Sequence, residues 1–358
     1  MVRALALALL ALLAAAAPAS AAVTPRFLGT GHDPGVAVDG AGTAHVAWLA
    51  EEGDQEFAEY CQVPRGARSC TARQRLLHSS FSSGKAQVLL GPQPGSVYVL
   101  VPVVNDPSVL FRSTDNGATF TAHPVGEFIG MEQALYGPGD SISIMNGGSV
   151  GAAFARYGVD GSGPAEMPVS FGSATESLDR DLVLHAGGLA AFLGSGEAMR
   201  SIFWTGVGDP NAQQNWIEGP RLGGNRTSPS AASGPSGTFV AYVDRKGRRS
   251  DTFVRRLRGQ RYRRARRVSR EDPTELSLAQ GPRGDLALLW RDSDDTWIVR
   301  SRRGRRWTRP KRLVRGSDPG DLHAALGPRG GWVVWDGSPG NIGSHPIRIA
   351  RIPRAPRR

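Results

Sequence analysis

The sequence is poor in the residues on which metal and redox sites depend. Its 358 residues include two cysteines, Cys61 and Cys70, and seven histidines scattered along the chain. The cysteines do not have the C-x-x-C spacing of redox or zinc motifs, and no pair of histidines has a metal-ligand spacing. We therefore expect neither a metal site nor a cofactor.

Long hydrophobic runs are also missing, except at the N-terminus. Val2 and Arg3 precede an unbroken Leu/Ala run from Ala4 to Ala17, and Ala19-Ser20-Ala21 fits the small-x-small pattern of a signal peptidase site. We expect residues 1–21 to be a signal peptide cleaved after Ala21, so that the protein is secreted; the alternative is an uncleaved N-terminal anchor. No later stretch approaches 18 consecutive apolar residues, so residues 22–358 are expected to form one domain without a membrane span.

The two cysteines have a structural interpretation in an exported protein. Eight residues separate Cys61 from Cys70, and Pro64 and Gly66 lie at the expected turn between them. Two strands joined by that turn would bring the two Cβ atoms within bridging range. Because close cysteine pairs usually form bridges in an oxidising compartment, we predict a Cys61–Cys70 disulfide.

Helical periodicity is nearly absent, whereas turn residues are abundant. The 46 glycines and 25 prolines are spread over the whole chain and alternate with short apolar runs. This pattern predicts many short strands joined by tight turns.

The strands follow a repeat. An apolar segment leads to a tight turn, and a second apolar segment follows, as in Val36–Trp48, Leu278–Trp290 and Ala324–Trp335. The turns recur every 46 to 51 residues, at Gly40, Gly91, Gly137, Ala186, Gly234, Gly281 and Gly327. A period of 40 to 50 residues with four short strands is what a β-propeller blade requires.

We therefore predict an all-β protein, a seven-bladed β-propeller of four-stranded blades. The last unit has a third strand, 347–352, but no room for a fourth. We expect the N-terminal strand, 25–28, to complete this blade and so to remove an open sheet edge. Six blades are the alternative count, and two β-sandwiches are the alternative architecture.

One segment carries a family resemblance. Ser113-Thr114-Asp115-Asn116-Gly117-Ala118-Thr119-Phe120 fits the pattern Ser-x-Asp-x-Gly-x-Thr-Trp/Phe and resembles the Asp-box (BNR) repeat of the sialidase superfamily. The Asp and Ser side chains are expected to satisfy turn amides, Gly117 to supply a positive φ, and Phe120 to pack under the turn. The resemblance implies a propeller in which this box is structural and lies on the face opposite the active site.

The catalytic residues of that superfamily are not recognisable in this sequence. A sialidase-type site needs three arginines that bind a carboxylate, a tyrosine nucleophile assisted by a glutamate, and an aspartate acid/base. The only Arg-Ile-Pro triplet is Arg351-Ile352-Pro353, at the C-terminus rather than near the start, and no tyrosine follows Tyr262. We assign no catalytic residues and expect a non-catalytic protein, with a sialidase-type glycoside hydrolase as the alternative.

Ligands of propellers usually bind the face formed by the connections between second and third strands and between blades. These connections are acidic here, and tryptophans end three of the strands before them. Carboxylates beside aromatic rings are typical of sugar recognition. For each residue alone, the favoured interpretation is a tryptophan in the core between blades or an acid at a solvated loop tip, and only the set as a whole indicates a ligand face. The candidates are Trp48, Glu51, Glu52, Asp106, Asp244, Trp290, Asp292, Trp335 and Asp336.

Charge is distributed unevenly. Residues 244–358 contain 30 Lys and Arg against 12 Asp and Glu. The basic stretches 245–270 and 300–315 are expected on the outer strands of their blades. They could attach to anionic polymers such as acidic glycans, or they could form a solvated arginine-rich rim. No element for specific reading of nucleic acid is present.

These observations favour a secreted, non-catalytic, sialidase-like propeller that binds an extracellular carbohydrate or another polymer. The alternatives are a divergent glycoside hydrolase on the same fold and a protein-interaction platform at the cell surface. A glycan or an anionic polymer is the expected partner, and we expect a monomer.

Overall fold

The computed structural model describes residues 23–354, except for 54, 80–83, 105, 127–130, 149–150, 166, 172–178, 196–197, 224, 248, 272, 317–318 and 338–343. These residues form antiparallel strands and one short 3-10 helix, η1 (Gln213–Asn215). The predicted signal peptide, residues 1–21, lies outside the described residues. No helix within the described ranges is long and apolar enough to cross a membrane.

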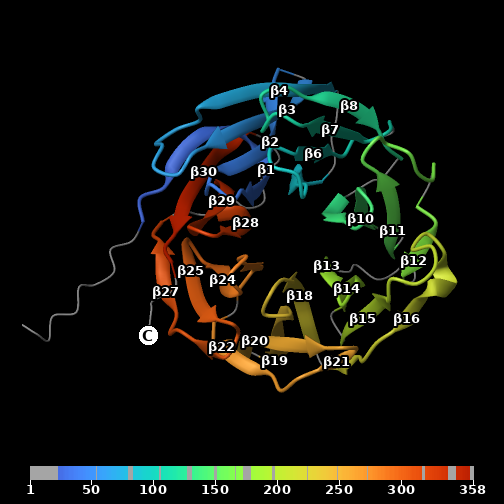
Figure 1. The fold of residues 1–358 in the computed structure, drawn as a ribbon. Helices are drawn as coiled ribbons and strands as arrows, with labels where there is room; N and C mark the ends of the chain where they lie inside the picture. The colour runs from blue at the N-terminus through green and yellow to red at the C-terminus, as the bar shows by residue number, and fades with distance from the viewer. Residues whose placement is uncertain are drawn as a thin grey trace, which may run out of the picture.

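The strands form six hydrogen-bonded sheets around a common axis (Figure 1). The first sheet has seven strands, in the order β28 (Pro319–Gly327), β29 (Gly330–Gly337), β30 (His345–Ile352), β1 (Arg26–Val38), β2 (Ala44–Glu52), β3 (Gln55–Val63) and β4 (Ala72–Ser79). Two sheets have four strands, namely β5 (Gln87–Leu90), β6 (Val97–Val101), β7 (Val109–Ser113) and β8 (Thr121–Pro124), and β9 (Met131–Gly137), β10 (Ser141–Gly148), β11 (Gly151–Gly158) and β12 (Val169–Phe171).

Each of the other three sheets has an outermost strand that is divided into two short pieces. They are β13 (Asp179–His185), β14 (Gly188–Ser195), β15 (Ala198–Trp204), β16 (Trp216–Glu218) and β17 (Leu222–Gly223); β18 (Asn225–Ala232), β19 (Thr238–Lys246), β20 (Arg249–Arg258), β21 (Arg261–Tyr262) and β22 (Arg266–Ser269); and β23 (Glu275–Gln280), β24 (Asp285–Asp292), β25 (Asp295–Arg302), β26 (Arg306–Trp307) and β27 (Lys311–Val314). Both pieces pair with the same neighbour, so these sheets are also four strands deep.

The innermost strands contact one another around the axis. The order of contact is β1, β5, β9, β13, β18, β23 and β28, and β28 contacts β1 again. Every predicted turn anchor lies at the end of an innermost strand or in the connection to the next strand. The structure therefore confirms an all-β propeller with four-stranded blades.

Strand β1 belongs to two of these four-stranded units. Its first half, Arg26 to Gly31, pairs with β30, and its second half, from His32, pairs with β2. The predicted completion of the last unit by the N-terminal strand is confirmed. A bulge at His32–Gly35 lies at the start of the second half. The turn pattern predicts seven units. Because β1 is hydrogen-bonded to both the first and the last unit, these two units form one sheet, and the strands form six sheets.

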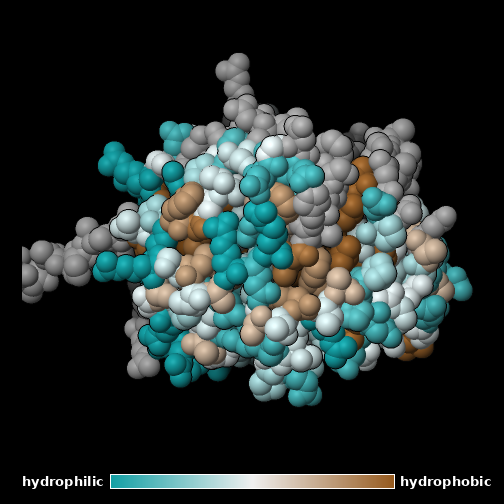
Figure 2. Space-filling model, turned by 90° about the horizontal axis from the view of Figure 1, so that it is seen from above, coloured by the Kyte–Doolittle hydropathy of each residue, from teal (hydrophilic) through white to brown (hydrophobic). Residues whose placement is uncertain are grey.

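The core lies between neighbouring four-stranded units. One cluster gathers Trp48 and Cys61 of β2 and β3 against Trp332 and Ile349 of β29 and β30. On the side that Figure 2 shows, hydrophilic side chains lie at the surface with smaller areas of hydrophobic surface between them. The apolar residues are therefore used mainly to join one blade to the next.

Near the axis, side-chain hydroxyls accept hydrogen bonds from backbone amides of the neighbouring innermost strand. Ser230 Oγ accepts a hydrogen bond from Leu278 N at 2.9 Å, and Ser277 Oγ accepts one from Ala324 N at 2.9 Å. Strands β18, β23 and β28 belong to different sheets, and these hydroxyls satisfy amides that face the next sheet. The same kind of bridge recurs about one repeat further along the chain, which indicates that the ring is built from equivalent units.

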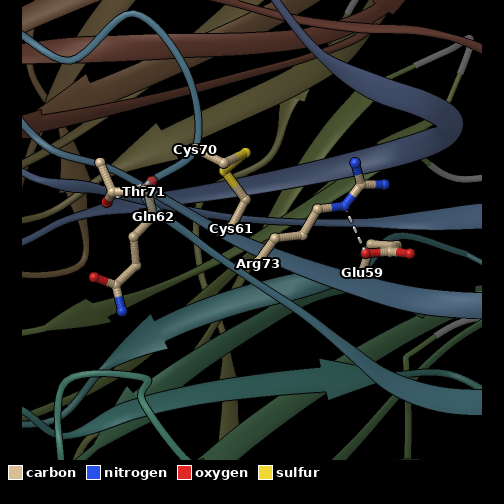
Figure 3. Close-up of a disulfide and its surroundings, with 6 residues drawn as sticks. All are labelled: Glu59, Cys61, Gln62, Cys70, Thr71 and Arg73. Atoms are coloured by element: carbon tan, nitrogen blue, oxygen red, sulfur yellow. Dashed lines mark hydrogen bonds and ion pairs between the residues drawn. A yellow bond between two sulfur atoms is a disulfide. The ribbon is translucent and has the colours of Figure 1, made fainter.

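The predicted disulfide is present. Cys61 of β3 is bonded to Cys70, which precedes β4, with a Cα–Cα distance of 5.6 Å (Figure 3). Beside it, Arg73 Nε donates to Glu59 Oε2 at 2.9 Å, and the Arg73 guanidinium lies over the Trp48 ring. The bridge therefore fixes the connection between β3 and β4 at the edge of a buried cluster.

Loss of this bridge is expected to lower the free energy of unfolding by about 2 kcal/mol, because the closed loop is short. The measurement is urea unfolding of the wild type and of the Cys61→Ala/Cys70→Ala variant, each with and without reductant. Reductant should shift the midpoint of the wild type and leave that of the variant unchanged. A wild-type midpoint that does not respond to reductant would contradict a stabilising bridge.

The turn at residues 113–120 has the hydrogen bonds that its sequence predicts. Asp115 Oδ1 accepts from the amides of Ala118 and Thr119 at 3.0 and 2.9 Å, and Ser113 Oγ accepts from Gly117 N at 2.8 Å. The hydrogen bonds from Thr119 lower the pKa of Asp115 to about 2. Gly117 has a φ of 80° and Phe120 packs edge-on against Tyr60 of the neighbouring sheet. The turn therefore holds two blades together.

Candidate functional site

The three tryptophans predicted on the ligand face are completely buried. Trp48 Nε1 donates to the Thr30 carbonyl oxygen at 3.1 Å, and Trp290 Nε1 donates to Glu271 Oε2 at 2.9 Å. Trp335 belongs to a cluster of buried residues between neighbouring sheets. None of the three rings is available for stacking on a sugar, so their role is that of core residues between blades.

The acidic candidates separate into exposed and buried groups. Glu52 is exposed and forms an ion pair with Arg75 at 2.9 Å, and Asp106 is exposed in the connection between β6 and β7. Asp292 lies at the end of β24, opposite Asp295 in the register of the hairpin. Asp244 and Asp336 are only 5% and 6% exposed. As a group these residues therefore do not form one binding surface.

A cluster of ionisable side chains lies instead where the innermost strands begin. We call it the axial cluster and define it as Asp33, Lys85, Glu275, Asp321 and Asp336. Lys85 Nζ is 3.2 Å from Asp321 Oδ1 and 3.5 Å from Glu275 Oε1. Lys85 precedes β5, Glu275 begins β23 and Asp321 lies in β28, so one ammonium group joins three sheets.

The carboxylate of Asp336 binds backbone amides of two other members of the cluster. Its Oδ1 accepts from Asp321 N at 2.7 Å, and its Oδ2 accepts from Asp33 N at 3.2 Å. A Cβ at Gly320 would lie 1.9 Å from Asp336 Oδ1, so the carboxylate fits only because that residue is glycine. Asp336 therefore positions the start of β28 and the bulge of β1.

His32, in the bulge of β1, gathers two further carboxylates. Its Nδ1 is 3.0 Å from Asp33 Oδ2, and its Nε2 is 3.4 Å from Glu56 Oε1 and 3.7 Å from Glu51 Oε1. Burial by itself would lower the pKa of His32, but the carboxylates of Asp33 and Glu56 outweigh it and raise the pKa to about 10. Within the described part of the chain, His32, Glu51 and Glu56 are the side chains that could hold a metal ion.

Burial raises the pKa of two carboxyl groups to values close to neutral pH. The pKa of Glu275 is raised by burial to about 7, and that of Asp33 is raised to about 6 by burial and by the hydrogen bond and charge of Asp321. Burial opposes ionisation of Asp321 as well, but the charge of Lys85 and the hydrogen bond from Asp33 lower its pKa. The cluster therefore holds protonated and ionised carboxyls side by side at neutral pH.

This arrangement can bind polar groups and move protons, but it differs from a sialidase-type site. The axial cluster has four carboxyl groups and one lysine as its members, with Arg291 near enough to Glu275 to lower its pKa. Three arginines and a tyrosine are not among these members. A protonated carboxyl can donate a hydrogen bond and an ionised one can accept it. Carboxyl groups of both kinds side by side are therefore suited to bind the hydroxyl groups of a ligand.

Sequence reasoning missed most of the axial cluster and of the carboxylates around His32. It singled out Asp336 and Glu51, but not His32, Asp33, Lys85, Glu275, Glu56 or Asp321. A signal was present in the repeat, because Glu275 and Asp321 place charged side chains at the start of innermost strands. The inward direction of those positions, and the reach of Lys85 across the axis, depend on the ring closure.

Comparison with known proteins supports the fold. No protein-family profile matches the sequence, and no curated protein matches it. The structure is similar to YCF48 bound to D1 peptide, with 13% identity over 93% of this chain and 96% of that chain and a TM-score of 0.56. It is similar to a lectin of Aleuria aurantia in complex with α-methyl-L-fucoside, with 15% identity, coverage of 82% and 98%, and a TM-score of 0.51. It is also similar to the Myceliophteria thermophila Cps50 (Swd1) β-propeller domain, with 12% identity, coverage of 92% and 100%, and a TM-score of 0.52. At these identities the likeness shows the β-propeller fold.

Proposed function

We propose that the chain is an exported, non-catalytic β-propeller that binds an extracellular carbohydrate at the face where the axial cluster opens. The observation that carries this proposal is the set of charged side chains from separate sheets that remains partly exposed at one end of the axis. The side chains of Asp33, Lys85, Glu275 and Asp321 are 25%, 24%, 21% and 33% exposed. A hydroxyl-rich ligand can accept from Lys85 and donate to the ionised carboxylates.

We also propose that the propeller has seven blades. Two findings support this count over the alternative of six. The ring of innermost strands has seven members, and β1 is shared by the sheets at its two ends. Dividing the seven-stranded sheet at the bulge of β1 gives two four-stranded blades.

The relation to the sialidase superfamily is part of the same proposal. Its support is the turn at 113–120, where Ser113, Asp115 and Gly117 make the contacts that the motif resemblance implies. Export is supported by the Leu/Ala run and the small-x-small site at residues 4–21, and it agrees with the Cys61–Cys70 bridge.

The test is a glycan array probed with the mature protein, followed by calorimetric titration of any bound glycan. Asp321→Asn keeps the size of the side chain but removes the charge beside Lys85, and it is expected to weaken binding at least about tenfold, the loss of one charge-assisted hydrogen bond. Asp140→Asn, at an exposed turn between β9 and β10, is the matched control and should bind like the wild type. No binding above background on the array, or equal affinity of both variants, would contradict the proposal.

A glycoside hydrolase is the second candidate, and one observation favours it. Glu275, with a pKa near 7, lies beside the same Lys85 that pairs with Asp321, so a protonated and an ionised carboxyl are close together, as glycosidases require. Hydrolysis of a fluorogenic sialoside by the purified protein, abolished in Glu275→Gln, would establish this function. Wild-type protein without turnover would exclude hydrolysis of that substrate.

A further inference from the structure

The arginine-rich stretches form the walls of a groove on the outside of the propeller. Strands β20–β22 and β25–β27 belong to neighbouring sheets in Figure 1. Between them lies a hollow of about 780 Å³. Its polar lining includes Arg256, Arg263 and Arg266 on one side and Arg303 and Arg305 on the other, with Trp307 beside them.

The hollow continues in two directions. A space of about 310 Å³ shares Arg256 and Arg263 with it, and another of about 260 Å³ shares Arg256, Arg303 and Arg305. The same guanidinium groups therefore line a continuous tract rather than one closed pocket. A tract of this form suits a chain-like ligand better than a single small anion.

The positive charge of the groove is hardly compensated by the protein. Arg267 forms an ion pair with Asp251 at 3.5 Å. Within the described ranges, no carboxylate forms an ion pair with Arg256, Arg263 or Arg305. Several exposed arginines facing one hollow repel one another, and an anionic ligand would remove that repulsion.

The walls are also held in place for such a ligand. The Arg266 guanidinium donates to the Arg305 carbonyl oxygen across the groove. The Arg256 guanidinium lies over the Phe239 ring, 5.8 Å from its centroid. Gly304 has a φ of 68°, and a Cβ there would lie 2.2 Å from the Phe239 ring, so the turn that carries Arg303 and Arg305 packs directly on the groove floor.

We propose that this groove binds an acidic polysaccharide, a chain of sugar rings that carries carboxylate or sulfate groups. The planar guanidinium fork binds oxoanions in a bidentate manner, and all the cations that line the groove are arginines rather than lysines. Single-stranded nucleic acid would need several aromatic rings on which bases stack, whereas Phe239 is 2% exposed and only Trp307 remains. The site is separate from the axial cluster and does not depend on the function proposed there.

The experiment is fluorescence anisotropy with two labelled probes, a heparin octasaccharide and a polygalacturonate octamer, and the mature protein. The triple variant Arg256→Gln/Arg263→Gln/Arg305→Gln is expected to lose at least about tenfold in affinity for the probe that binds. The matched control, Arg68→Gln/Arg221→Gln/Arg329→Gln, removes the same charge from exposed positions outside the groove. It should lose less than about threefold.

The outcomes separate this site from its alternatives. Equal losses in both triple variants would mean that net charge alone attracts the polymer and would overturn the proposal. Tighter binding of a single- or double-stranded 20-nucleotide DNA, with the same sensitivity to the groove variant, would also overturn it. No binding of either saccharide would overturn it as well. Asp321→Asn should leave the affinity for the saccharide unchanged, so failure at the axial cluster and failure at the groove can be told apart.

Discussion

Replacement of Lys85 by methionine is expected to lower the free energy of unfolding by about 3 kcal/mol at pH 7. Lys85 is the cation that faces both Asp321 and Glu275, and its removal takes the nearest opposite charge away from these two half-buried carboxyl groups. Breaking a buried ion pair from one side costs about 3–5 kcal/mol. The lower end applies because the three side chains remain between a fifth and a third exposed.

Urea unfolding at pH 7 measures this effect, with Lys311→Met as the matched control. Lys311 is exposed on β27, so its replacement should change the unfolding free energy by less than about 0.5 kcal/mol. The double variant Lys85→Met/Glu275→Gln also removes the charge of Glu275, which has lost its lysine partner. It should therefore be more stable than Lys85→Met alone. A Lys85→Met variant as stable as the control would show that the cluster does not need its cation.

The repeat could be predicted from the sequence because it depends on local signals. Turn residues at Gly40, Gly91 and the later anchors end each innermost strand, and the apolar segments on either side supply the buried faces between sheets. The disulfide and the turn at 113–120 also depend on short spacings, and both were predicted correctly. Completion of the last unit by β1 could be predicted because that unit was one strand short.

The candidate site could not be predicted in the same way. A strand alternates its side chains between two faces, but both faces of a propeller blade are buried against neighbouring blades. Trp48, Trp290 and Trp335 were therefore consistent with either the core or a ligand face until the sheets were placed. Lys85 meets Glu275 and Asp321 only because the ring brings the starts of separate innermost strands to one point. No spacing along the chain reports a contact of that kind.

The stability of the wild type relative to Glu275→Gln is expected to fall by about 2 to 3 kcal/mol between pH 5 and pH 8. Burial raises the pKa of Glu275 to about 7, above its ordinary value near 4.3 in an unfolded chain. The contribution of Glu275 to the free energy of unfolding is therefore fully present below about pH 4 and is lost as the pH rises through 7. The reason is that Glu275 ionises more easily in the unfolded chain than in the folded protein. Glutamine stays neutral throughout and lacks this dependence.

The comparison with the variant is needed because other groups titrate in the same range. Burial, followed by the charge of Lys85, lowers the pKa of His323 to about 3, so this residue favours the folded state as the pH rises towards 6.5. His32, with a pKa near 10, acts in the opposite direction above pH 6.5. Both histidines are present in each protein, so the difference between the two urea midpoints, multiplied by the slope, isolates Glu275. A difference that stays constant from pH 5 to pH 8 would mean that Glu275 is ionised throughout and that the axial cluster holds no proton on this side at neutral pH.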